Sequence, residues 1–110
     1  MLRARDFLGR PRHDDIAAAH ATLGNRDEAT ALAAKATTID PENPSVLYNV
    51  ACTYALIGEI EKSIDCLEQS ISSGMAQVEW IENDPDLEAV REHERFKNLL
   101  QEIRRKRSTP

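Results

Sequence analysis

Two histidines, His13 and His20, are the side chains of this chain best suited to bind a metal ion, and they lie seven residues apart. On a helix this spacing places both on one face, with Asp14 and Asp15 nearby. A zinc site needs three or four converging ligands. Only two histidines are aligned here, and no cysteine lies close to them in sequence. A packing or surface role is therefore favoured, and no metal site is predicted.

The two cysteines, Cys52 and Cys66, are separated by 14 positions and lack CxxC spacing. This arrangement does not indicate a redox motif or a disulfide scaffold. At least one of the two is expected to be a small, buried, apolar side chain. A reduced, cytoplasmic setting is the simplest interpretation.

Catalytic motifs are missing from the sequence. It contains no phosphate-binding GxxxxGK[ST] loop, no GxSxG elbow and no HExxH pair. The acidic residues are scattered over positions that suit helix caps or solvated faces, where paired catalytic carboxylates are not expected. We therefore expect no enzymatic activity and no cofactor.

The distribution of charge argues against nucleic acid and membranes as partners. Residues 13–90 carry 15 acidic side chains but only three basic ones, Arg26, Lys35 and Lys62. Such a body repels polyanions over a Debye length of about 8 Å. The basic run 104–107 has no interleaved aromatic residues and is typical of a solvated helix end. No apolar run approaches the ~20 residues of a membrane helix, and no secretory signal is visible.

The elements that must position these side chains are predicted to be helices. Aromatic residues make up 5% of the chain and alanine is abundant, which suits close helix packing better than a β-sandwich. Gly24 and Gly58, 34 residues apart, are each expected to end one helix before the next begins. After each glycine, matched positions carry Ala29, Ala33 and Ala36 in the first unit and Ser63, Leu67 and Ser70 in the second, so the first and last of the three are small in both units. A fixed period of about 20–50 residues marks a repeat architecture.

Apolar spacing and capping residues give the expected helix bounds. Asn43 with Pro44, and Asp84 with Pro85, each indicate a cap followed by a first helical turn. The predicted helices cover 11–23, 27–38, 44–57, 60–73, 85–90 and 92–106. Their inward faces are predicted to carry Ile16, Ala17, His20 and Ala21; Ala29, Leu32, Ala33 and Ala36; Leu47, Val50, Ala51 and Tyr54; Ile64, Leu67 and Ile71; and Phe96, Leu99, Leu100 and Ile103.

Residues 11–75 resemble two tandem tetratricopeptide repeats, helix-turn-helix units of about 34 residues. Counted from Pro44, the family's signature positions 4, 7, 8, 11, 20, 24 and 27 are Leu47, Val50, Ala51, Tyr54, Ser63, Leu67 and Ser70. In the first repeat they are His13, Ile16, Ala17, His20, Ala29, Ala33 and Ala36, followed by Asp40 and Pro41. The resemblance implies an all-α, right-handed superhelix of two helical hairpins with a divergent C-terminal capping region.

This resemblance also divides the chain. A divergent first repeat is expected at 11–43, a second repeat at 44–75, and capping helices at 76–106 that close the stack. Residues 1–10 are predicted to be a disordered N-terminal extension, and 107–110 a tail. The C-terminal region resembles the ending of bacterial multidomain signalling proteins that carry such repeats, among them class III adenylate cyclases, serine/threonine kinases and winged-helix regulators.

In this family the first helix of each repeat lines a concave groove that contacts partners. The resemblance implies that the groove includes Asp14, Ala18, Ser45, Tyr48, Asn49, Cys52 and Leu56. A mixed apolar and acidic groove suits an extended or helical segment with basic and apolar side chains. Alternatively, Tyr48 and Leu56 pack against a neighbouring domain of a longer parent chain.

The sequence thus predicts a protein–protein interaction or scaffold module, cytoplasmic, that binds a peptide or partner domain on its concave helix face. The alternative is a regulatory C-terminal segment of a larger signalling enzyme, such as a class III adenylate cyclase or a serine/threonine kinase. Because two repeats leave the first helix exposed, self-association through that end is also expected.

Overall fold

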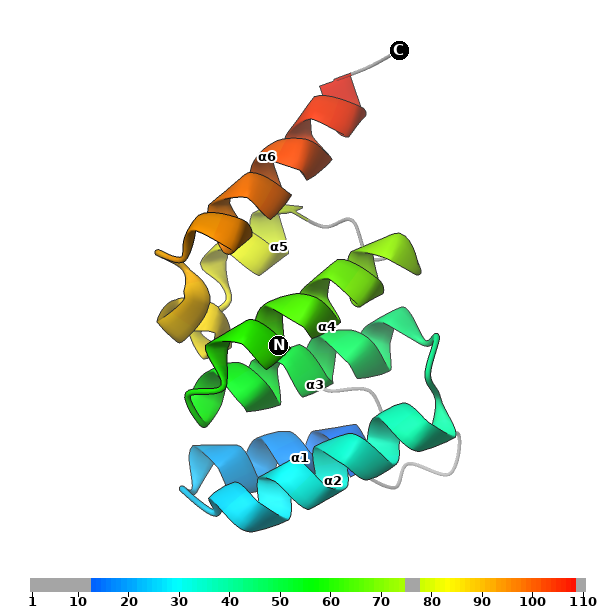
Figure 1. Ribbon diagram of the computed structural model, residues 1–110, viewed down its shortest axis with the longest axis vertical. Coiled ribbons are helices and arrows are strands. Elements are labelled where there is room, and N and C mark those ends of the chain that lie inside the picture. Colours follow the sequence, from blue (N-terminus) through cyan, green and yellow to red (C-terminus); the bar gives the residue numbers. More distant parts are fainter. Residues whose placement is uncertain (1–12, 75–77, 109–110) are drawn as a thin grey trace.

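The computed structural model describes residues 13–74 and 78–108, and every regular element within them is a helix (Figure 1). The elements are α1 (His13–Thr22), α2 (Arg26–Ile39), α3 (Pro44–Leu56), α4 (Ile60–Ser72), α5 (Val78–Asn83), the 3₁₀ helix η1 (Pro85–Val90) and α6 (Glu94–Ser108). The predicted all-α fold is confirmed. The N-terminal extension at 1–10 lies outside the described residues.

Three layers follow one another along the long axis of the molecule. Figure 1 shows the α1–α2 hairpin at one end, the α3–α4 hairpin in the middle with η1 beside it, and α5 and α6 toward the other end. No helix among the described residues has both the length and the apolar character needed to cross a bilayer.

The two glycine turns are geometrically equivalent. Gly24 has a φ of +84° and Gly58 a φ of +83°, in the left-handed region where a side chain is strained. After each glycine the next backbone N–H closes the same turn at 2.8 Å, from Asn25 to the His20 carbonyl and from Glu59 to the Tyr54 carbonyl. This is the hydrogen-bond pattern of a Schellman helix end. The 34-residue period is therefore a repeat of structure as well as of sequence.

Small side chains at the repeat positions allow the hairpins to pack closely. Ala17, Ala33 and Ala36 form one buried cluster with Val46 and Val50, which joins the first hairpin to α3. The second hairpin uses hydroxyl groups at matching places. Ser63 Oγ donates to the Ala51 carbonyl and Ser70 Oγ to the Pro44 carbonyl, both at 2.7 Å. A larger residue at these positions would hold the helices apart.

The capping predictions are confirmed by side-chain geometry. The Asn43 side chain accepts hydrogen bonds from the Ser45 and Val46 amides and starts α3. The Asp84 side chain accepts from the Asp86 amide and starts η1. Each cap is followed by a proline that has no amide hydrogen to leave unsatisfied.

The C-terminal layer contains two features that the sequence pattern did not predict. Helix α5 has only six residues, too few to show a helical period, and it was missed. The segment after Asp84 is a 3₁₀ helix. Both are part of the core, because Val78, Ile81, Leu87 and Val90 lie in one buried cluster with residues of α3, α4 and α6.

The prediction of inward-facing residues fails most clearly at Ile16, which is 36% exposed. Among the described residues, α1 packs on α2 and α3, so one of its sides has no neighbouring helix. Ala17 and Ala21 face the neighbours and are buried. His20, Leu32, Tyr54, Ile71 and Leu99 are partly buried, and the other predicted inward residues are buried.

Candidate functional site

The predicted groove residues have very different environments in the structure. Ser45 is exposed and Leu56 is partly buried. Ala18, Tyr48, Asn49 and Cys52 are buried. Asp14 belongs to α1, and its side chain is outside the described part of the chain. Contact of these seven residues with a partner stays a prediction, and in this arrangement the four buried side chains are closed to solvent.

Tyr48 and Cys52, one turn apart on α3, are covered by the chain's own C-terminal layer. Tyr48 Oη donates to Asp84 Oδ2 at 2.7 Å, and both side chains are buried. Tyr48, Cys52 and Ala55 share their apolar cluster with Leu87 and other residues of α5, η1 and α6. A buried tyrosine needs a partner for its hydroxyl group, and Asp84 supplies it.

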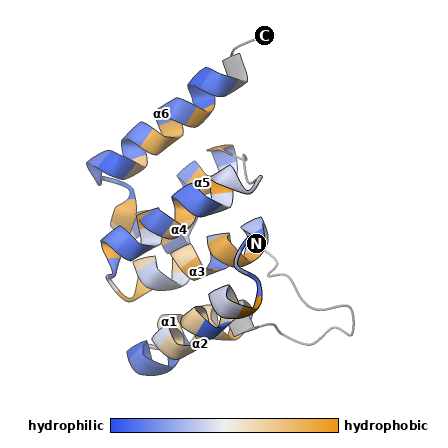
Figure 2. Ribbon diagram, turned by 45° about the vertical axis from the view of Figure 1, so that its right-hand side comes forward, coloured by the Kyte–Doolittle hydropathy of each residue, from blue (hydrophilic) through white to orange (hydrophobic). Residues whose placement is uncertain are grey.

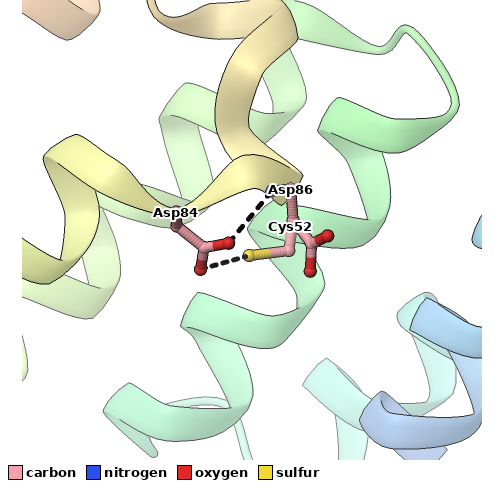
Figure 3. A group of neighbouring side chains, drawn as sticks. All are labelled: Cys52, Asp84 and Asp86. Carbon is pink, nitrogen blue, oxygen red and sulfur yellow. Dashed lines mark hydrogen bonds between the residues drawn. The ribbon is translucent and has the colours of Figure 1, made fainter. Parts of the chain in front are cut away.

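Asp84 joins the C-terminal layer to α3, and Figure 3 shows it beside Cys52 of α3 and Asp86 of η1. Its Oδ1 accepts from the Asp86 amide at 3.0 Å, while Oδ2 accepts from Tyr48 and from Cys52 Sγ at 3.9 Å. Its backbone carbonyl accepts from Arg91 Nη2 at 2.7 Å. Asp84 thus caps η1 and holds it against α3.

A metal ion would have to compete with these bonds. Potential ligand atoms of Cys52, Asp84 and Asp86 lie within 4.8 Å of one another. However, both oxygens of Asp84 already accept hydrogen bonds from protein donors. The geometry is that of a helix cap above a buried tyrosine, and it gives no support to a cation site.

Of the histidine pair considered above, the structure describes only the His20 side chain. Asn25 Nδ2 donates to His20 Nδ1 at 3.0 Å, so this imidazole is used at the first glycine turn. The His13 side chain is outside the part of the chain that the structure describes.

Cys66 is the less deeply buried of the two free thiols, and it is held in its neutral form. Burial, together with the nearby Asp65 carboxylate, raises the pKa of Cys66 to about 11. A thiol in this state is a poor nucleophile near neutral pH. Burial also raises the pKa of Tyr54, with smaller contributions from Cys66 and Glu59.

An ion-pair network that the sequence interpretation missed connects α6 to α4. Arg95 contacts Glu61 at 2.6 Å, Asp65 at 2.7 Å and Glu68 at 3.0 Å. His93 Nε2 lies 2.8 Å from Glu61. Hydrogen bonding to Arg95 lowers the pKa of Glu61, and His93 acts in the same direction. The signal was present in the sequence, because acids at 61, 65 and 68 share one helix face.

Beside this network, two adjoining hollows run along α4, and together they are called the α4 trough below. The first has a volume of about 420 Å³ and lies between α4 and α6; it is lined by Glu68, Ile71, Ser72, Leu99, Glu102, Ile103 and Lys106. The second, of about 450 Å³, continues to the loop before α3; it is lined by Pro41, Glu42, Asp65, Glu68, Gln69, Ser72 and Ser73. Glu68 and Ser72 line both. The trough depends on how α6 packs, which residue spacing does not give.

Comparison with known proteins gives the following matches. A family model described as tetratricopeptide repeat matches residues 14–43 and 44–73, more than half of the chain. The sequence is 38% identical over 64 residues to a protein of Arabidopsis thaliana that is described as chloroplastic. That stretch covers 57% of this chain and 19% of the plant protein, so the chain spans about a fifth of that relative. No solved structure matches. The expected resemblance to bacterial signalling proteins is not shown by these comparisons.

Proposed function

The chain belongs to the tetratricopeptide repeat family, and from this premise we propose that it is a protein–protein interaction module without catalysis of its own. Repeats of this kind stack and present extended surfaces. The observation that carries the proposal is the face of α3 formed by Tyr48, Cys52 and Ala55, called the α3 face below. This face already holds the chain's own C-terminal layer through an apolar cluster and the buried bond from Tyr48 to Asp84. A surface that binds one segment of protein in this way is suited to protein recognition.

The partner face is proposed to include the groove residues of the two first helices, Asp14, Ala18, Ser45, Tyr48, Asn49, Cys52 and Leu56. Ser45 and Leu56 are the described members of this set with accessible side chains, so they would make direct contact. The buried members would support the face from beneath. The free thiols Cys52 and Cys66 are compatible with a reducing compartment such as the cytoplasm.

Site-specific photo-crosslinking in the full chain tests this proposal. A benzophenone amino acid is placed at Ser45 or at Leu56, and at exposed Ala34 of α2 as the matched control. After irradiation in a lysate, we expect discrete protein adducts from the first two positions and none of the same mass from Ala34. The absence of such adducts, or the same adducts from all three positions, would contradict the proposal.

A further inference from the structure

The α4 trough combines an apolar end with an acidic end. Ile71 and Leu99 are partly buried and face the hollow between α4 and α6, with Ile103 beneath them. Figure 2 shows α6 with hydrophobic residues on one side and hydrophilic residues on the other. Covering partly exposed apolar side chains is favourable by about 25 cal/mol per Å² of apolar surface removed from water. The volume of about 420 Å³ lies within the range of roughly 300–1,000 Å³ typical of ligand pockets.

The other end of the trough is acidic. Glu42, Asp65 and Glu68 line the second hollow, and none of the described residues that line it is basic. Glu102 adds a further carboxylate beside the apolar end, where it lies 3.7 Å from the Lys106 ammonium group. Glu42 lies in the loop before α3 and is exposed. A field of this sign attracts cationic groups and repels phosphate.

The chain itself shows what chemistry these carboxylates accept. The Arg95 guanidinium lies within 3.0 Å of both Asp65 and Glu68, and it also contacts Glu61. Three carboxylates share this one guanidinium, so the cluster keeps a net negative charge. Guanidinium and ammonium groups are the natural partners of such a cluster.

From this juxtaposition we propose that the α4 trough is a docking surface for a partner-protein segment in which apolar side chains are flanked by lysine or arginine. Apolar side chains enter the hollow between α4 and α6, and basic side chains reach Glu42, Asp65 and Glu68. A groove between two helices accepts an amphipathic helix, whose contacts recur every three or four residues. The inference rests on the proposed interaction function and adds, beside the face of the first helices, a second surface with its own partner chemistry.

Fluorescence anisotropy with the full chain tests the inference. The probe is a labelled 18-residue amphipathic peptide made of Leu, Ala and Lys, and its counterpart carries Glu in place of Lys. We expect the lysine peptide to bind and the glutamate peptide to bind at least tenfold more weakly. Raising the salt concentration should weaken binding of the lysine peptide, since its ion pairs lie at the surface.

Matched variants locate the binding. Glu42→Lys with Glu102→Lys reverses two trough charges and leaves the Arg95 network intact. Glu28→Lys with Glu88→Lys changes the net charge equally at exposed positions outside the trough. Each trough reversal should weaken the lysine peptide by about two- to fivefold, as expected of exposed ion pairs. Leu99→Ala should weaken it further, and circular dichroism checks that each variant is folded.

Several results would overturn the inference. These are equal binding of the two peptides, no binding of the lysine peptide, or equal effects of the two double variants. If light scattering shows a dimer that only the trough variants dissociate, the occupant is a second copy and the inference is wrong. Crosslinks from Ser45 and Leu56 that persist, together with lysine-peptide binding that the trough variants leave unchanged, would leave the interaction function standing and show that the trough assignment is wrong.

Discussion

At the scale of single residues, the pair Tyr48 and Asp84 joins α3 to the C-terminal layer. The phenol would be costly to bury without an acceptor, and the carboxylate would be costly to bury without donors. Each satisfies the other at 2.7 Å in the interior. The pair therefore ties a residue of the repeat pattern to a residue of the C-terminal layer.

Tyr48→Phe tests the strength of this bond. The variant keeps the ring but leaves Asp84 Oδ2 without its closest donor. Bonds to charged groups contribute about 1.5–3 kcal/mol, so we expect a loss of that size in the free energy of unfolding. Tyr54→Phe is the matched control, since that ring is partly buried and contacts Lys62 through its face. Equal urea midpoints for the two variants would show that the bond contributes little.

Cys66 gives a prediction about alkaline pH. Its pKa is raised to about 11 in the folded chain, while an unperturbed thiol titrates near about 8.5. Below the unperturbed pKa the thiol is protonated in both states, and its favourable burial contributes fully to the free energy of unfolding. As pH rises toward the folded pKa, only the unfolded chain loses the proton, so this contribution is lost. Between these values, the urea midpoint of the natural chain should fall more steeply than that of Cys66→Ala. Parallel curves would contradict the assignment. Burial, which is the main cause of the raised pKa of Tyr54, is present in both chains.

At the scale of elements, much of the fold could be predicted from the sequence. The first two hairpins follow from two glycines, two prolines and a periodic set of alanines and serines, because these residues act locally. Helix α5 and the 3₁₀ form of η1 could not be predicted, since six-residue elements are set by tertiary packing. The burial of Tyr48 was missed for the same reason: the covering segment lies 36 residues further along the chain.

The site was harder to predict than the fold. Residue types at groove positions identify a helix face, but they do not say what covers it. The α4 trough depends on how α6 packs against α4. The bonds of Arg95 that join these two helices connect residues 27 to 34 positions apart in the sequence. Acids at 61, 65 and 68 marked a helix face in the sequence, but not the arginine that would reach it.

The equivalence of the two glycine turns can be measured directly. A Cβ at Gly24 or at Gly58 would meet no atom within 4 Å, so an alanine there is strained by its backbone alone. We expect Gly24→Ala and Gly58→Ala to lower the free energy of unfolding by similar amounts, about 1–2 kcal/mol each. Thermal or urea unfolding of both variants provides the comparison. Penalties that differ severalfold would mean that the turns are not the same structural unit.

At the scale of the whole molecule, the three layers form one continuous stack, and residues 78–90 of the chain cover the α3 face. The largest apolar cluster spans α3, α4, α5, η1 and α6, so the second repeat and the C-terminal layer share a core. This arrangement closes part of the α3 face and leaves the α4 trough open on another side. A partner is therefore expected to bind surfaces beside the covered part of the α3 face, such as the α4 trough.

Native-state hydrogen exchange of the full chain measures whether residues 78–90 stay on the face of α3 that carries Tyr48. If residues 78–90 are a permanent occupant of the α3 face, the slowest amides of η1 and α6 should exchange with the same free energy as those of α3, through global unfolding. Exchange of η1 and α6 through a separate opening, several kcal/mol lower and with α3 still protected, would contradict the claim. It would mean that the segment leaves the α3 face while the repeats stay folded.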